Sequence, residues 1–148
     1  MSKLNFSISG NSITATRYDG KSRHFSLIVD EPEALGGKDS APNPVEYLLA
    51  AYAGCLNVVI HLVAKELQVP VSNIKIDING DINPDRLFGL DTVDRAGFES
   101  LTVDIDLDTD APRELIDKLF ERVKDRCPLN DNLSNSTPLN YNIKHLVK

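Results

Sequence analysis

Sulfur and large aromatic side chains are scarce in this sequence. Its 148 residues contain two cysteines, one methionine and no tryptophan. Two cysteines are too few for the disulfide scaffold of a small secreted domain, which excludes that class of protein. No Cys-x-x-Cys occurs and the three histidines lack the spacing of metal ligands, so we expect neither a metal site nor a bound cofactor.

A basic run is missing as well. The sequence has 16 Lys and Arg against 22 Asp and Glu, a formal net charge of −6, which disfavours binding to nucleic acid or to an anionic membrane surface. The first seven residues lack the apolar core of a secretion signal, so we expect a cytoplasmic protein. An apolar stretch over 47–64 approaches the length of a membrane span, but it contains Asn57 and His61, and we interpret it as a buried core helix.

The length and the order of patterns predict one α+β domain over residues 1–148. Apolar and polar residues alternate in the first thirty residues, which predicts a three-stranded antiparallel meander with turns at Gly10-Asn11 and at Asp19–Lys21. The same alternation predicts further strands at 74–82, 101–107 and 139–143.

Two helices interrupt these strands. Asn43 and Glu46 form the pattern of a capping box, and they predict a helix that runs to about Leu67. A second helix is predicted to begin after a cap residue, Asp110, and to end at Cys127, because apolar residues recur there every four positions.

The two cysteines are the first candidates for chemistry, because a thiol is the only strong nucleophile here that also takes up an oxidant. Cys55 lies twelve residues after Asn43, too far from the helix N-terminus for the helix dipole to stabilise a thiolate. Cys127 has Lys124 and Arg126 nearby in the sequence, and these cations could lower its pKa. Packing in the core is the alternative role for both cysteines, since free cysteines are among the most buried residues.

Other polar residues fit structural roles. On a continuous helix, nine positions at 100° per residue place Glu46 about 180° away from Cys55, so Glu46 is interpreted first as a cap residue. Alternating acidic residues along one strand indicate a solvated sheet face rather than a calcium loop. They are Asp104, Asp106, Asp108 and Asp110.

Three segments are shared with a known family: DEPEALGG at 30–37, PNPVEYLLAAYAGC at 42–55 and RCPL at 126–129. In these segments, and in the order of its elements, the sequence resembles the osmotically inducible protein C and organic hydroperoxide resistance family, OsmC/Ohr. Phe88-Gly89-Leu90 and Gly97-Phe98 make it more similar to the general OsmC-like branch than to the dedicated peroxidases.

The resemblance implies a fold and a chemistry. The fold is a tightly intertwined homodimer, in which antiparallel sheets of both subunits wrap two central helices and the active sites lie at the subunit interface. The chemistry is thiol-dependent reduction of organic hydroperoxides in oxidative-stress defence. By this resemblance Cys55 is the peroxidatic cysteine, which forms a sulfenic acid, and Cys127 is the resolving cysteine, which closes a disulfide that a dithiol reductant then opens.

The support for the thiolate departs from the family pattern. In the peroxidases, a glutamate ten residues before the peroxidatic cysteine pairs with an arginine that holds the thiolate. Val45 occupies that position here and Glu46 is one position off. The remaining candidates for the support are therefore Glu46 together with Arg17 or Arg23 from the N-terminal strands.

Three functions stay open at this point. The first is a thiol-dependent hydroperoxide reductase, which the presence of both cysteines favours. The second is a non-enzymatic OsmC-like dimer that binds a small apolar ligand at the subunit interface, which Val45 favours. The third is a structural interaction protein whose cysteines only pack. The distance between the sulfur atoms of Cys55 and Cys127 discriminates among them.

Overall fold

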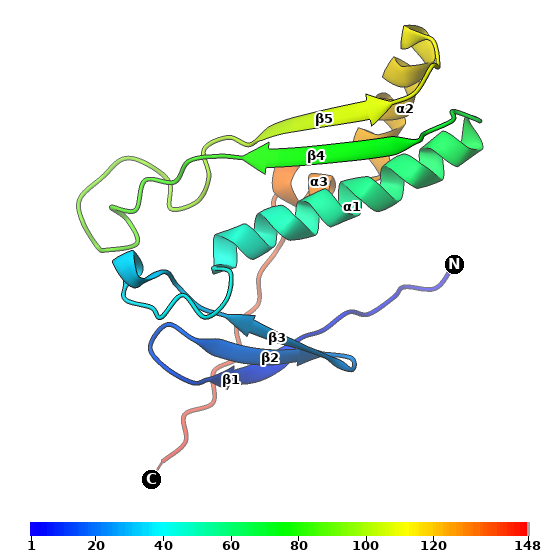
Figure 1. Ribbon diagram of the computed structural model, residues 1–148. Helices are drawn as coiled ribbons and strands as arrows, with labels where there is room; N and C mark the ends of the chain where they lie inside the picture. Colours follow the sequence, from blue (N-terminus) through cyan, green and yellow to red (C-terminus); the bar gives the residue numbers. More distant parts are fainter. Residues whose placement is uncertain (148) are drawn as a thin grey trace. The chain divides into compact units, whose positions relative to one another are not determined.

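The computed structural model describes residues 1–147, which form helices and two antiparallel sheets (Figure 1). The elements are β1 Ser9–Ser12, β2 Tyr18–Ser22, β3 Phe25–Val29, η1 Glu33–Leu35, α1 Pro44–Glu66, β4 Asn73–Asn79, β5 Thr102–Asp108, α2 Arg113–Arg126 and α3 Pro128–Ser134. The predicted α+β class is confirmed. Contacts divide the chain into an N-terminal unit, Met1–Ala51, and a C-terminal unit that begins at Tyr52, and α1 contributes residues to both. A single domain over 1–148 stays a prediction, and residue 148 lies outside the described residues.

The N-terminal unit contains the predicted antiparallel meander β1–β2–β3, but the first turn is displaced. Gly10 lies inside β1 and pairs with Gly20 of β2, so the predicted turn at Gly10-Asn11 is wrong. The chain turns later, where the backbone N–H of Ile13 donates to the carbonyl of Arg17. A Cβ on Gly10 would lie 2.1 Å from the carbonyl oxygen of Asp19. Glycine is therefore required here by the close approach of two strands and not by a turn.

The second turn is displaced in the same direction. Asp19 and Lys21 pair with Ile28 and Ser26 of β3, so they are strand residues and the turn predicted at Asp19–Lys21 is wrong. The chain reverses instead at Arg23, which has a left-handed φ of 56°. A short β-hairpin favours such a positive φ in its turn, because its twist then matches that of the strands.

A buried carboxylate organises the loop between β3 and α1. Asp30 is 1% exposed and accepts hydrogen bonds from the hydroxyls of Thr16 and Ser40 and from the backbone N–H groups of Glu31, Lys38 and Ser40. The Ser40 hydroxyl, and next the Glu31 amide, hold the pKa of Asp30 well below its ordinary value, although burial opposes the shift. All of these bonds favour the charged form, so they weaken when the carboxyl is protonated.

Replacing Asp30 by asparagine is expected to destabilise the protein at neutral pH and to flatten the acid branch of its stability curve. Because the folded-state pKa lies below the unfolded value of about 3.9, the stabilisation is complete above that value and is lost as the pH falls through it toward the folded-state pKa. Urea midpoints between pH 7 and pH 3 measure the effect. Asp39→Asn, at an exposed aspartate of the same loop, is the matched control. Parallel pH curves for wild type and Asp30→Asn would contradict the assignment.

Helix α1 begins at the predicted capping box. The backbone N–H of Glu46 donates to Asn43 Oδ1 at 2.9 Å, and that of Asn43 donates to Glu46 Oε2 at 2.8 Å. The helix ends at Glu66, where Gln68 takes a left-handed φ of 55° and the N–H of Val69 bonds back to the carbonyl of Ala64. Glu46 is thus occupied as a cap residue, as predicted.

By length and composition alone, α1 could cross a membrane, with a mean hydropathy of 1.8 over an 18-residue window. Core helices of globular proteins meet the same two criteria. A third of that window, 33%, is buried within the chain. The buried residues are Tyr52, Leu56, Val59, Ile60, Val63 and Ala64. They form one wall of the core, so this part of the helix is accounted for by packing.

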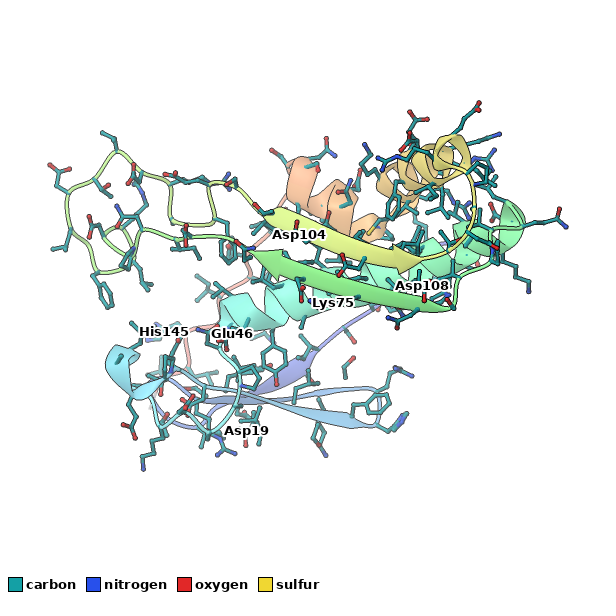
Figure 2. All side chains as sticks on the ribbon, turned by 45° about the horizontal axis from the view of Figure 1, so that its top comes forward. Asp19, Glu46, Lys75, Asp104, Asp108 and His145 are labelled. Carbon is teal, nitrogen blue, oxygen red and sulfur yellow. The ribbon has the colours of Figure 1, made fainter. Side chains whose placement is uncertain are left out.

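The core of the C-terminal unit lies between α1, α2 and one face of the β4–β5 hairpin. Ile60 and Val63 of α1 and Leu119 and Val123 of α2 are completely buried. The strands pair antiparallel, and their inward residues pack against this cluster. Their alternate residues are exposed, and Lys75, Asp104 and Asp108 lie on this outer face (Figure 2). The predicted solvated acidic face is confirmed for Asp104, Asp106 and Asp108, whereas Asp110 lies beyond the end of β5.

Three details of the C-terminal half differ from the predictions. Asp110 is not the cap of α2, because the residue at that position is Pro112, which makes no side-chain cap bond. The short helix α3 was not predicted. The prediction of a closing strand over 139–143 is wrong, since none of the described residues after Ser134 lies in a strand and Tyr141 is 80% exposed. A strand requires a neighbour for its backbone N–H and C=O groups, and within residues 1–147 this segment pairs with none.

Candidate active site: the Cys55–Cys127 pair

The structure brings the two cysteines into contact. The Sγ atoms of Cys55 and Cys127 are 3.1 Å apart, and both residues are free thiols. Cys55 lies on α1 and is partly buried, whereas Cys127 is completely buried between α2 and α3. A disulfide needs the sulfurs at about 2.05 Å, so closure requires an approach of only about 1 Å.

Cys127 is held by the junction of two helices. It is the C-cap of α2 and also the N-cap of α3, with an extended backbone at φ −77° and ψ 114°. Pro128 imposes that conformation, because a residue before proline is pushed out of the α region, and proline is well suited to the first position of the new helix. At this cap the Cys127 sulfur accepts a hydrogen bond from the backbone N–H of Asn130 at 3.4 Å.

Burial dominates the electrostatics of Cys55. It raises the pKa of the thiol, and the nearby sulfur of Cys127 raises it further. The backbone amide of Leu129 opposes these effects and lowers the pKa. The first turn of α3 therefore acts on both cysteines: the Leu129 amide lowers the pKa of Cys55, and the Asn130 amide donates to the Cys127 sulfur.

A chain of hydrogen bonds runs beside the two sulfurs. The hydroxyl of Tyr52 donates to Asn130 Oδ1 at 2.7 Å, and Asn130 Nδ2 donates to the carbonyl of Lys124 at 2.9 Å. Tyr52 is 7% exposed, and its pKa is raised first by burial and then by the proximity of Cys127 and Cys55. The hydroxyl therefore stays protonated and remains a donor at neutral pH.

The cation next to Cys127 in the sequence is engaged elsewhere. Both terminal nitrogens of Arg126 donate to the carboxylate of Glu66, at 2.6 and 2.9 Å. This bidentate pair ties the end of α2 to the end of α1. The guanidinium of Arg126 is therefore paired with Glu66, and a role for it beside Cys127 stays a prediction.

The other predicted site residues lie in the N-terminal unit, where each is engaged by a neighbour. Arg17 forms a bidentate ion pair with Asp19, at 2.7 and 2.9 Å. The guanidinium of Arg23 lies 4.9 Å from the centre of the Phe25 ring. Glu46 caps α1. Their part in a redox site therefore stays a prediction.

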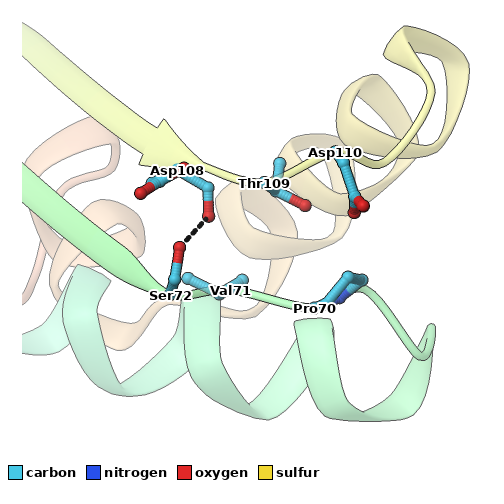
Figure 3. Close-up of a pocket in the computed structure, with 6 residues that line it drawn as sticks. All are labelled: Pro70, Val71, Ser72, Asp108, Thr109 and Asp110. Atoms are coloured by element: carbon cyan, nitrogen blue, oxygen red, sulfur yellow. Dashed lines mark hydrogen bonds between the residues drawn. The ribbon is translucent and has the colours of Figure 1, made fainter.

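A separate pocket has no cysteine in its lining. This open pocket of about 380 Å³ lies where β4 begins and β5 ends (Figure 3). It is lined by Pro70, Val71, Ser72, Asp108, Thr109 and Asp110. The Ser72 hydroxyl donates to the Asp108 carbonyl there, so local bonds already use these groups. Among residues 1–147, no group of three or more His, Cys, Asp or Glu side chains is arranged to bind a metal.

Three residues beside the pair were not predicted from the sequence as site residues: Tyr52, Leu129 and Asn130. One signal could have found the last two. Proline directly after a polar cap residue marks a helix start, and Cys127-Pro128 has this form. A helix beginning there places the amides two and three residues after the cap beside the cap side chain.

Comparison with known proteins agrees with this structure. A sequence model of the family described as OsmC-like protein matches residues 37–142, while none of the curated proteins compared matches the chain. Among solved structures, an OsmC-like protein from Mycoplasma pneumoniae superposes with a TM-score of 0.78 at 15% identity, covering 91% of each chain. The organic hydroperoxide resistance protein OsmC from Legionella pneumophila gives 0.66 at 16% identity, covering 88% of this chain and 89% of that one.

A third solved structure is similar to the same degree. An organic hydroperoxide resistance protein from Elizabethkingia anophelis superposes with a TM-score of 0.66 at 19% identity, covering 91% of each chain. Likeness at these identities shows the fold, and the family match extends over more than half of the sequence. The chain therefore belongs to the OsmC-like protein family.

Proposed function

We propose that this protein reduces organic hydroperoxides through Cys55 and Cys127, as part of a defence against oxidative stress. The observation that carries the proposal is the 3.1 Å distance between two free thiols on different helices. The substrate class is suggested by similar structures that are named organic hydroperoxide resistance proteins. A contact between two thiols is what a peroxidatic and a resolving cysteine require.

The proposed reaction has two steps in the protein. The Cys55 thiolate attacks one oxygen of the hydroperoxide, the O–O bond breaks, and the alkoxide leaves as an alcohol after taking a proton. Cys55 is then a sulfenic acid. The Cys127 thiolate next attacks the Cys55 sulfur, an S–S bond forms, the S–O bond breaks, and the departing hydroxide becomes water. An external dithiol returns the disulfide to two thiols.

The order of the cysteines follows from access and from hydrogen bonding. Cys55 is partly exposed, whereas Cys127 is 0% exposed, so an oxidant reaches Cys55 first. The Leu129 amide lowers the pKa of Cys55 and so favours its thiolate. For the cation that holds this thiolate we propose an arginine of the N-terminal strands. Arg17 is already neutralised by Asp19, which makes Arg23 the stronger candidate.

One equivalent of an alkyl hydroperoxide added to the reduced protein is expected to consume both thiols and to yield one equivalent of alcohol. Peptide mapping should recover a Cys55–Cys127 disulfide within one chain, because the sulfurs need to approach by only about 1 Å. Thiol titration and mass spectrometry measure this outcome. Recovery of both thiols free, with the hydroperoxide unconsumed, would overturn the proposed function.

We further propose that the protein works as a homodimer. Val58 and Leu62 lie one turn apart on α1, and they are 56% and 50% exposed. The terminal segments also carry exposed apolar side chains at alternate positions, such as Phe6 at 85% and Ile143 at 89%. Apolar residues in this amount are costly in water, and a second copy of the chain could cover the helix and pair with the terminal segments.

A non-enzymatic role is the second candidate. The raised pKa of Cys55 leaves less thiolate at neutral pH, and Val45 stands where the peroxidases of the family carry a glutamate. Both features would suit a non-enzymatic OsmC-like dimer that binds a small apolar ligand at the subunit interface. Consumption of hydroperoxide separates the two candidates, because a binding protein leaves the O–O bond intact.

A further inference from the structure

We infer that Asn130, held by the hydroxyl of Tyr52, is a positioning residue for disulfide closure: it keeps Cys127 aligned with Cys55 for the second step. The inference rests on the proposed function and concerns the same site. It assigns to Tyr52 and Asn130 a role in one step of the reaction and none in the attack on the hydroperoxide.

Asn130 makes three hydrogen bonds beside the two cysteines. Its Oδ1 accepts from Tyr52, its Nδ2 donates to the Lys124 carbonyl, and its backbone N–H donates to the Cys127 sulfur. The two side-chain bonds, with Tyr52 and Lys124, fix the orientation of the side-chain amide. Tyr52 lies on α1 and Lys124 in the last turn of α2, so this side chain of α3 joins both of the other helices.

The bonds of Asn130 act at the end of α2 and at the turn of α1 that carries Cys55. Lys124 lies in the last turn of α2, where carbonyl groups lack partners within the helix. Its bond to Asn130 satisfies one of these carbonyls and closes the bend that contains Cys127. Tyr52 lies three residues before Cys55, and therefore on the same side of α1 as the reacting sulfur. The Tyr52–Asn130 bond thus links the turn that carries one sulfur to the turn that carries the other.

Closure of the disulfide requires a defined geometry of the two sulfurs. The sulfurs start 3.1 Å apart and must reach about 2.05 Å, with a defined torsion about the new bond. Small errors in the position of an attacking group cost large factors in rate. Attack of Cys55 on a hydroperoxide needs no such alignment with Cys127, so loss of the Tyr52–Asn130 bond should slow closure selectively.

The test compares Tyr52→Phe and Asn130→Ala with Tyr47→Phe. Tyr47 lies on the same helix and its hydroxyl also makes one hydrogen bond, to the carbonyl of Ile28, so it is a matched control in the N-terminal unit. Two rates are measured in a single turnover: formation of the sulfenic acid and closure of the disulfide. We expect closure to slow about tenfold in both test variants, a loss of about 1.4 kcal/mol, with sulfenic acid formation unchanged and with both rates unchanged in the control.

A second readout does not depend on hydroperoxide. Ellman's reagent reacts with Cys55 and releases one coloured thiolate, and attack by Cys127 on the mixed disulfide then releases a second. The second release should show the same tenfold slowing in Tyr52→Phe, even if the protein consumes no hydroperoxide and the proposed function fails. Wild-type closure rates in Tyr52→Phe, or equal slowing of both releases, would overturn the inference. Because Tyr52→Phe removes a single oxygen atom, it keeps the test decisive if Asn130→Ala does not fold.

Discussion

Replacing Cys55 by serine is expected to reduce hydroperoxide consumption to the rate of the buffer. Serine cannot form the thiolate that attacks the O–O bond, and Cys127 is buried with no exposed surface. Replacing Cys127 by serine should give a different result: one equivalent of hydroperoxide consumed, no catalytic turnover, and a sulfenic acid trapped on Cys55. Rates with an alkyl hydroperoxide and a dithiol reductant measure both effects, and a sulfenic-acid reagent detects the trapped state.

The pH dependence of the same reaction provides a control. Burial raises the pKa of Cys55 above its ordinary value of about 8.5, so the thiolate fraction increases with pH throughout the neutral range. The rate of the first step should therefore rise steadily from pH 6 to pH 8.5 in wild type and in Cys127→Ser. A wild-type rate no greater than that of Cys55→Ser at every pH would contradict the enzymatic proposal and favour ligand binding.

Local patterns predict the parts of this fold whose causes are local. The capping box of Asn43 and Glu46 involves only neighbouring residues, and it forms as the sequence indicates. The alternation in β4 and β5 likewise reports one buried and one solvated face. Turns were less predictable. Gly10 suggests a turn by composition, but its role depends on the strand that passes beside it, which only the register reveals.

For the candidate site too, the sequence predicts the local features but not those that depend on tertiary packing. The identities of Cys55 and Cys127 can be read from the sequence, whereas their contact depends on how α1 packs against the junction of α2 and α3. Tyr52 and Asn130 are 78 residues apart, and no spacing rule connects them. Arg126 shows the opposite case: it is adjacent to Cys127 in the sequence, but the bend of the chain directs it to Glu66.

The strand predicted over residues 139–143 is absent from the single chain, and a homodimer would explain why the sequence has this pattern. Residues 139–143 alternate as a strand does, yet Leu139, Tyr141 and Ile143 are 72%, 80% and 89% exposed. Alternation indicates a sequence suited to pair with a sheet edge, yet within residues 1–147 this segment pairs with no strand. A sheet edge in a second copy of the chain would account both for the alternation and for the absence of a strand in the single chain.

A charge placed on the exposed apolar face of α1 is therefore expected to break the dimer. Val58→Asp puts a carboxylate at a position that we propose to be buried between the subunits, and an isolated carboxylate in an apolar interface is strongly disfavoured. At a loss of about 2 kcal/mol or more, the dissociation constant should rise at least about thirtyfold. Light scattering and sedimentation at micromolar concentration measure the change.

The control is the same substitution at Val93, which is 99% exposed in the loop between β4 and β5. Val93→Asp should leave the dimer intact, because it adds the same charge outside the proposed interface. Dimerisation should also order the chain termini, so amide hydrogen exchange over residues 139–143 should be slow in wild type and fast in Val58→Asp. A wild-type protein that is monomeric at micromolar concentration, or a dimer that Val58→Asp leaves unchanged, would show that α1 is not the contact surface. If Val58→Asp leaves the dimer unchanged, slow exchange over residues 139–143 would require a different pairing of the two chains.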